Sequence, residues 1–193
     1  VVLAAHPDDE TMGAGGLIRR VHAAGGRVTV MVATDGEASH PRSDSHTRTD
    51  LRSLRRAEVT RALRALAPTA EVCFLGLPDG GLRENTAALD DALDAAFDEV
   101  LATRGSAPAR TLIVAPWSGD GHRDHRIAAE SAVRVAGRRG VRHRGYPIWL
   151  WHWGQPEDVP WERGASLTMT PGESAIKSRA LRTHVSQLQP HSD

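Results

Sequence analysis

Short apolar segments alternate with amphipathic segments along the chain. An apolar run without polar alternation is typical of a strand that is buried on both faces. Five runs predict such strands: VVLAA at residues 1–5, RVTVMVAT at 27–34, EVCFLGL at 71–77, RTLIVAP at 110–116 and YPIWLWHW at 146–153. In the last run Trp149, Trp151 and Trp153 would share one side of a strand, where we expect them to pack in the core.

The segments between these runs carry apolar residues at helical spacing. The predicted helices cover residues 11–26, which end in a double glycine, residues 51–67, a segment marked by Leu89, Leu93, Phe97 and Val100, residues 125–137, and a last segment that begins at the TPGE motif of residues 170–173. In that motif a threonine cap, a first-turn proline and a capping-box glutamate occur together. Alternating strands and helices with short connections predict an α/β, three-layer, Rossmann-like fold with a mainly parallel sheet.

The composition excludes several classes of partner. Basic and acidic residues number 24 each among 193 residues, so the formal net charge is zero. We therefore expect no nucleic-acid partner and no attraction to an anionic membrane. The sequence has no apolar stretch near the roughly 18 residues of a membrane span. Cys73 is the single cysteine, which fits a reducing cytoplasm and, in mid-strand, predicts a small buried side chain.

Two polar clusters follow the first and fourth predicted strands. HPDDE begins at His6, and GHRDHR contains His122 and His125. Because ligands bind beyond the carboxyl ends of parallel strands, we expect both clusters at one edge of the sheet. His6, Asp9 and His125 together supply the two imidazoles and one carboxylate of a catalytic zinc site, and ferrous iron suits the same ligands. The alternative for either cluster is a set of helix-capping acids and a loop histidine.

The remaining residues of these two clusters have different predicted roles. Asp8 diverges from its neighbour Asp9, so it could accept a proton from metal-bound water. Glu10 is expected to be a first-turn acid that the helix dipole favours. His122 could stabilise a developing oxyanion, with Asp124 holding its ring and raising its pKa.

At this point the residues resemble a known family. AAHPDDE, TDGE, FLGLPDGG, GHRDH and the late HVSQ segment, in this order, are similar to the PIG-L/LmbE-like N-acetylglucosaminyl deacetylases, and the resemblance covers nearly the whole chain. It implies a metal-dependent hydrolase over residues 1–193, one domain truncated at both ends relative to many relatives. It further implies that His6, Asp9 and His125 bind the metal and that Asp8 is the general base.

The resemblance also implies the remaining roles and the class of substrate. His122 becomes the imidazolium that stabilises the tetrahedral intermediate, tuned by Asp124, and Arg123 stands where the family more often has proline. The resemblance implies that the substrate is an N-acyl amino sugar or glycoconjugate, with an amide of a thiol conjugate as the alternative. The sequence does not identify which amide is cut, or the oligomeric state. We expect the loop of residues 36–50 and the region after Trp149 to decide the substrate.

Several residues have two interpretations. Arg55 and Glu58 lie on or beside the apolar face of their helix, where they would form an internal ion pair or contact sugar hydroxyls. Asp79 follows the third strand, at the edge where a substrate would bind, but a turn aspartate is an equal alternative. Lys177 and His184 are seven residues apart and would share a helical face that approaches the site or faces solvent.

Three other functions use similar sequence features. GAGG after the first strand is typical of a metal-free nucleotide-binding module, but the spacing is not GxGxxG and HPDDE occupies the phosphate turn. A metal-binding domain without activity would need neither Asp8 nor His122. A metallo-phosphoesterase is disfavoured because the chain shows no evident ligands for a second metal.

Overall fold

A parallel five-stranded sheet lies at the centre of the computed structural model, which describes residues 1–41, 46–102 and 107–188. The strands are β1 (Val2–Ala4), β2 (Thr29–Thr34), β3 (Glu71–Leu77), β4 (Leu112–Pro116) and β5 (Arg142–Tyr146). Their order is β3-β2-β1-β4-β5, and every pair is parallel. The predicted Rossmann-like α/β fold is confirmed, with a topological switch point between β1 and β4.

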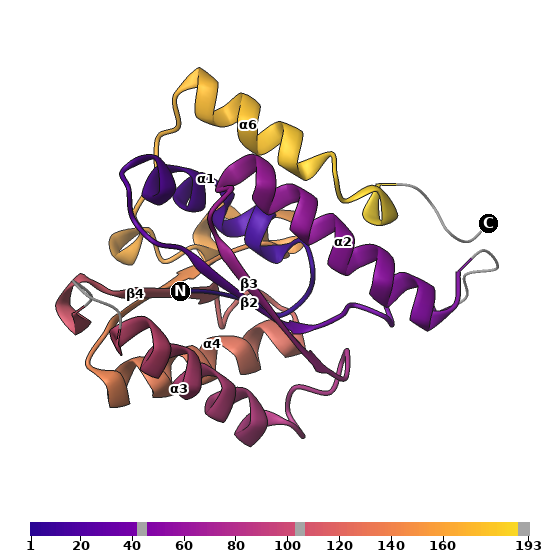
Figure 1. Ribbon diagram of the computed structural model, residues 1–193, viewed down its shortest axis with the longest axis horizontal. Helices are drawn as coiled ribbons and strands as arrows, with labels where there is room; N and C mark the ends of the chain where they lie inside the picture. Colours follow the sequence, from indigo (N-terminus) through magenta and orange to yellow (C-terminus); the bar gives the residue numbers. More distant parts are fainter. Residues whose placement is uncertain (42–45, 103–106, 189–193) are drawn as a thin grey trace.

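Helices cover both faces of this sheet. The elements are α1 (Asp9–Ala23), α2 (Arg48–Leu66), α3 (Thr86–Ala102), α4 (Arg123–Arg139), α5 (Leu150–Trp153) and α6 (Pro171–Leu181), with short 3-10 turns at η1 (Pro108–Arg110), η2 (Pro156–Asp158), η3 (Trp161–Arg163) and η4 (Val185–Gln187). Figure 1 shows α1, α2 and α6 on one side of the sheet and α3 and α4 on the other. Among the described residues, none of the helices combines the length and the apolar composition that a membrane span needs.

Two apolar cores separate these layers. Side chains alternate along a strand, so Val30 and Val32 of β2 pack in the core under α1 and α2, whereas Met31 packs in the core under α3 and α4. Phe97 of α3 is fully buried in that second core. The sheet is therefore covered on both faces, as its apolar strands predicted.

Helix α6 begins as its motif predicted. The Thr170 side chain accepts a hydrogen bond from the Glu173 amide, and the Glu173 carboxylate accepts one from the Thr170 amide. Arg20 of α1 donates two hydrogen bonds to the same glutamate. The cap thus also ties α6 to α1.

The prediction of a fifth strand at residues 146–153 is wrong. The strand ends at the first residue of that segment: it covers Arg142–Tyr146, and only Tyr146 of it is buried because β5 is at the edge of the sheet and pairs with β4 alone. Pro147 has no N–H to continue the ladder, and residues Leu150–Trp153 form the single turn α5. Trp151 is 64% exposed, so the expected core packing of these tryptophans is wrong as well.

Two further predictions on single residues are wrong. Cys73 is exposed, because β3 is the other outer strand and has a neighbour on one side only. His184 does not share a helical face with Lys177, because α6 ends at Leu181 and the chain turns into η4. Residues 42–45 of the polar loop expected over 36–50 lie outside the described part of the chain.

Candidate active site

The two polar clusters meet at one edge of the sheet. HPDDE joins β1 to the start of α1, and His122 caps the start of α4, which follows β4. Because β1 and β4 are neighbours, the ring centroids of His6 and His122 are 4.8 Å apart, and those of His122 and His125 are 4.6 Å apart. The expected convergence of residues more than a hundred positions apart is therefore confirmed.

Asp9 is held rigidly at the centre of this cluster. Its Oδ2 accepts hydrogen bonds from the backbone amides of Ala5 and His6, at 2.9 and 2.8 Å. Its Oδ1 lies 3.4 Å from Nε2 of His125. Burial opposes ionisation of Asp9, but the charges and hydrogen bonds of His125 and His6 outweigh it and hold the pKa well below its usual range. Asp9 therefore presents a charged oxygen towards His125.

His125 has one ring nitrogen engaged and the other free for a ligand. Nδ1 lies 2.5 Å from Oδ2 of Asp120, whereas Nε2 is buried and has no hydrogen-bond partner among the described residues. Burial opposes protonation of the ring, but the neighbouring carboxylates of Asp9 and Asp120 outweigh it and raise the pKa to about 9, so this position attracts positive charge. A buried polar atom without a partner is costly, so Nε2 fits a site that a cation completes.

The donor atoms form two groups that fit a metal ion. One ligand atom from each of His6, His122 and His125 lies within 4.8 Å of the others, and the same holds for His6, Asp79 and Asp124. The predicted ligand Asp9 is outside both groups but faces His125, and its Oδ2 is 3.6 Å from Nδ1 of His6. Imidazole and carboxylate donors suit zinc and ferrous iron alike.

Asp8 adopts a strained backbone conformation that several groups enforce. It is the one non-glycine residue with positive φ, 129°, in the described part of the chain. Its amide donates to the Glu10 carboxylate at 3.0 Å, and Arg55 donates both to the Pro7 carbonyl at 2.6 Å and to Oδ2 of Asp8 at 3.2 Å. Burial raises the pKa of Asp8 to about 6, against the charge of Arg55. A carboxylate with a pKa near neutrality suits a general base.

Sequence reasoning missed two carboxylates of this centre. Glu10 was expected only to favour the first turn of a helix, but it is fully buried and its pKa is raised to about 7 by burial. Asp120 was not selected at all, although it is fully buried against His125. Its position two residues before the His122 motif, after an apolar strand, is the sequence signal that would have found it.

The charge of Asp124 raises the pKa of His122, as expected, but burial and two charged neighbours outweigh it. Nδ1 of His122 accepts a hydrogen bond from the backbone amide of Asp124, while the Asp124 carboxylate accepts one from the Gly80 amide and lies 3.4 Å from Nε2 of His6. Burial, with the charges of His6 and His125, lowers the pKa of His122 to about 4, and the charge of Asp124 offsets only part of this. His122 is therefore a neutral imidazole that carries its proton on Nε2.

The two candidate substrate residues lie differently. Asp79 is at the site, with Oδ1 3.3 Å from Nε2 of His6 and Oδ2 accepting from the Ala38 amide. Arg55 is only 3% exposed and also donates to the Gly36 carbonyl, so both terminal nitrogens of its guanidinium have internal partners. The internal partner of Arg55 is Asp8, whereas Glu58 binds the amide and hydroxyl of Ser186.

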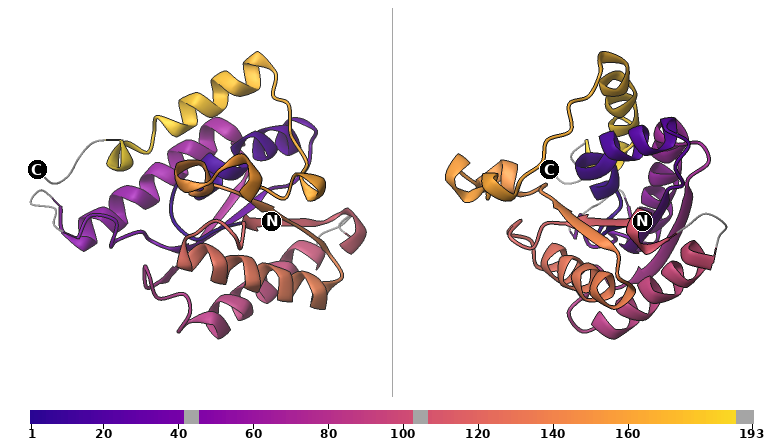
Figure 2. Two further views of the ribbon diagram at one scale, coloured as in Figure 1. Left: turned by 180° about the vertical axis from the view of Figure 1, so that it is seen from behind. Right: turned by 90° about the vertical axis from the view of Figure 1, so that its left-hand side faces the viewer.

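A tryptophan-bearing segment borders the site. The ring of Trp149, 48% exposed, stacks beside His122 at 6.0 Å and 25°. Trp153 donates from its indole to the Asp120 carbonyl. Figure 2 shows the segment that carries these side chains standing out from the three layers.

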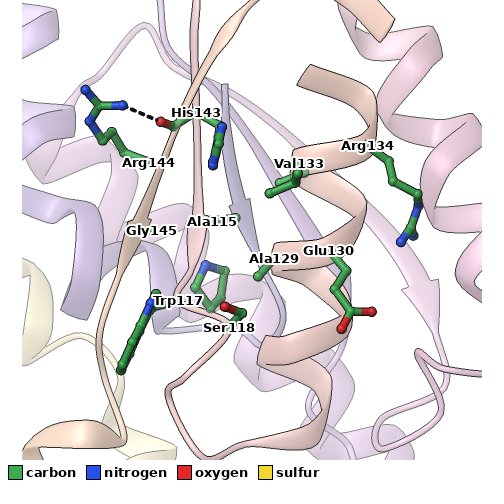
Figure 3. Close-up of a pocket in the computed structure, with 12 residues that line it drawn as sticks. Ala115, Trp117, Ser118, Ala129, Glu130, Val133, Arg134, His143, Arg144 and Gly145 are labelled. Atoms are coloured by element: carbon green, nitrogen blue, oxygen red, sulfur yellow. Dashed lines mark hydrogen bonds between the residues drawn. The ribbon is translucent and has the colours of Figure 1, made fainter. Parts of the chain in front are cut away.

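A separate hollow lies between α4 and the ends of β4 and β5. Its volume is about 350 Å³, and Figure 3 shows Trp117, Ser118, Glu130 and His143 among the side chains around it. None of the predicted site residues lines this hollow. It is therefore not the predicted metal site.

Comparisons with known proteins agree with the sequence resemblance. The family described as PIG-L, GlcNAc-PI de-N-acetylase, matches residues 1–136. The chain is 32% identical over 173 residues to a 1D-myo-inositol 2-acetamido-2-deoxy-alpha-D-glucopyranoside deacetylase 2 of Saccharopolyspora erythraea, covering 81% of this chain and 61% of that protein. It is 30% identical to a probable N-acetyl-alpha-D-glucosaminyl L-malate deacetylase 2 of Bacillus subtilis, covering 98% of this chain and 83% of that protein.

A solved structure supports the fold. The N,N'-diacetylchitobiose deacetylase of Pyrococcus horikoshii superposes with a TM-score of 0.73 at 19% identity, over 98% of this chain and 70% of that one. The chain spans less than two thirds of the Saccharopolyspora relative, 61% of its length. The likeness in structure therefore concerns the fold, and the family match concerns most of the chain.

Proposed function

The chain belongs to the PIG-L family, and from this premise we propose that residues 1–193 form a metal-dependent deacetylase domain acting on an N-acylated amino sugar. The observation that carries the proposal is the convergence of His6, Asp9 and His125 beside Asp8, at the switch point of the sheet. A catalytic carboxylate with a pKa of about 6 next to a cluster of cation ligands is more than a structural metal site requires.

His6, Asp9 and His125 would hold the metal, and zinc is the ion we propose. The unpartnered Nε2 of His125 and the charged Oδ1 of Asp9 are the atoms that this assignment best explains. When bound, a Lewis-acidic divalent ion polarises an amide carbonyl and makes water more acidic. Two imidazoles and one carboxylate are a common ligand set for that chemistry.

Asp8 would move the proton. Its carboxylate takes the proton of the attacking water and returns it to the nitrogen of the leaving amine, so that an acid and a free amine are released. Arg55 holds Oδ2 of Asp8 and the preceding carbonyl, and Glu10 holds the Asp8 amide. The base is therefore fixed before a substrate arrives, which lowers the cost of reaching the reactive geometry.

His122 would stabilise the oxyanion as a neutral donor. Since Nδ1 accepts from the Asp124 amide, the ring offers its Nε2–H to the carbonyl oxygen of the substrate as negative charge develops there. A pKa of about 4 keeps the imidazole neutral at physiological pH. Asp124 acts here by positioning His6 and the Gly80 turn.

The substrate class follows from the relatives. The two relatives described above are deacetylases of N-acetylglucosaminyl compounds joined to inositol and to malate, so we propose a small N-acetylglucosaminyl conjugate for this chain. Asp79 lies beside His6 and is partly exposed, so its carboxylate would accept a hydrogen bond from a sugar hydroxyl. We place the reaction in the cytoplasm, in keeping with a single cysteine.

The test joins metal content with amine release. Purified protein is analysed for bound metal and assayed for free amine with N-acetylglucosaminyl inositol, N-acetylglucosaminyl malate and N,N'-diacetylchitobiose. We expect one ion per chain and turnover of at least one compound. Asp8→Ala should keep the metal and lose roughly 10²–10⁴-fold in rate. Asp90→Asn, on the surface pair of α3 with Arg134, is the matched control with unchanged turnover. Metal-loaded protein that releases no amine, or an Asp8→Ala variant with full turnover, refutes the proposal.

A further inference from the structure

Asp120 is a buried carboxylate at the junction of two parts of the site. It is fully buried between the end of β4 and the start of α4. Its Oδ1 accepts from the amides of Ile148 and Leu150, at 2.8 and 3.0 Å, and its Oδ2 accepts from the amide of Trp149 at 3.0 Å and contacts His125 at 2.5 Å. Four N–H groups on one carboxylate fully use its acceptor capacity.

The contact with His125 selects a tautomer. Both oxygens of Asp120 accept hydrogen bonds, so Nδ1 of His125 is the donor. A metal ion that displaces the second ring proton would meet the lone pair of Nε2, because Nδ1 keeps its proton; Nε2 is the atom that is buried without a hydrogen-bond partner, 3.4 Å from Oδ1 of Asp9. A carboxylate behind a metal-ligating histidine fixes ring orientation and raises ligand basicity.

The same carboxylate fixes the rim of the site. Three amides, those of residues 148–150, converge on Asp120 where the chain leaves β5 and enters α5. This anchor sets Trp149, whose indole stacks beside His122 at 6.0 Å. The main-chain carbonyl of Asp120 also accepts from the indole of Trp153. The position of the aromatic rim thus depends on the residue that orients His125.

We propose that Asp120 is a positioning residue that holds His125 in its metal-ligating tautomer and fixes Trp149 at the mouth of the site. The inference rests on the proposed function, because it concerns the same metal. A merely structural role, as a cap for residues 148–150, would affect folding and the rim but would leave the metal affinity of His125 unchanged.

The test compares Asp120→Asn with a control on α4, the helix that carries His125. The side-chain amide of asparagine has the shape of the Asp120 carboxylate, but its NH₂ group cannot accept a hydrogen bond. It would face one of the N–H groups that now donate to Asp120, and this disfavours the tautomer of His125 that is protonated at Nδ1. Val135→Ala is the control, because Val135 is fully buried on α4 in the core far along the helix from His125. We measure the dissociation constant for zinc by competition with a chromophoric chelator, and amide exchange of residues 148–150 by mass spectrometry.

We expect Asp120→Asn to bind zinc about 10–100-fold more weakly and to exchange the three amides faster. Val135→Ala should lower the melting temperature with zinc affinity unchanged. A second measurement needs no variant: in zinc-loaded wild-type protein, nitrogen NMR should show a protonated Nδ1 on His125.

Two results overturn the inference. Wild-type zinc affinity in folded Asp120→Asn assigns the residue a structural role only, and an unprotonated Nδ1 in the zinc-loaded protein rules out the proposed tautomer even if the variant does not fold. Failure of the wild type itself to bind zinc would instead reject the proposed metal site, so the two failures are distinguishable.

Discussion

Replacing Arg55 with methionine tests how Asp8, the proposed general base, is kept ionised. The guanidinium lies 3.2 Å from the Asp8 carboxylate and is 3% exposed. At an effective dielectric constant of about 20, opposite unit charges at this distance attract by about 5 kcal/mol, an upper bound equal to nearly 4 pKa units. Relaxation and water entry reduce such shifts, and a rise of about 1–3 units in the pKa of Asp8 is expected.

The assay is the pH dependence of kcat/KM for the substrate identified by the panel. The acidic limb of the profile should move upward by about 1–3 units, so that at pH 7 Arg55→Met is roughly tenfold slower and recovers as the pH rises. Arg52→Met is the matched control: Arg52 is on the same helix, but it is about half exposed and pairs with Asp35, 3.1 Å away. Its profile should coincide with that of the wild type.

The variant should also be less stable. Removal of the cation raises the pKa of Asp8, so the variant should lose about 1 kcal/mol of unfolding free energy at pH 7 and about 1.4–4 kcal/mol at alkaline pH, where the buried carboxylate is charged. Because both pKa values lie above the usual value of an aspartate, this cost is full above the raised pKa of the variant and disappears as the pH falls below the wild-type pKa of about 6. A raised KM with an unmoved acidic limb would refute the reasoning and would make Arg55 a sugar contact.

Two further predictions concern stability. Burial raises the pKa of Glu10 from 4.5 to about 7, so folded Glu10 keeps a proton that the unfolded chain loses, and wild-type stability falls as the pH rises through this range. Relative to Glu10→Gln, the metal-free wild type should lose roughly 3 kcal/mol of unfolding free energy between these pH values. Urea-unfolding free energies of the two proteins that change in parallel with pH would contradict this. Gly121 has φ 82°, and an added Cβ would lie 2.6 Å from the indole nitrogen of Trp153. Gly121→Ala should therefore lower the midpoint of urea unfolding more than the control Gly140→Ala, where φ is 63° and nothing lies within 4 Å of an added Cβ. Equal midpoints would show that the indole moves aside without cost.

The fold could be predicted because its strongest signals are local. Apolar runs such as residues 27–34 and the capping box at Thr170 specify their elements without help from distant residues. The edge strand β5 could not be found this way, because Arg142–Tyr146 gains its place only from pairing with β4. The apolar residues that follow it imitate a strand, but the missing N–H of Pro147 ends the ladder.

The sequence could predict which residues form the candidate site, but not their protonation or all of their hydrogen-bond partners. HPDDE and GHRDH contain residues that bind metal ions, and both follow strands of a parallel sheet at the same edge. The sequence could therefore predict that His6, Asp9 and His125 lie close together. The protonation of His122 could not, since it depends on the burial of the ring and on two neighbouring imidazoles. The role of Asp120 was equally hidden, because its partners at residues 148–150 lie in a segment that sequence reasoning assigned to a strand.

The position of β1 at the middle of the sheet has a consequence for synthesis of the protein. β1 is made before β4, yet the two strands pair in the sheet, and His6 lies beside His125 of α4. While the chain is still emerging from the ribosome, β1 and β2 have an open edge where β4 will later insert. We therefore expect the nascent chain to need protection at that edge, and the proposed metal site to form only after residues up to Arg139 have left the exit tunnel.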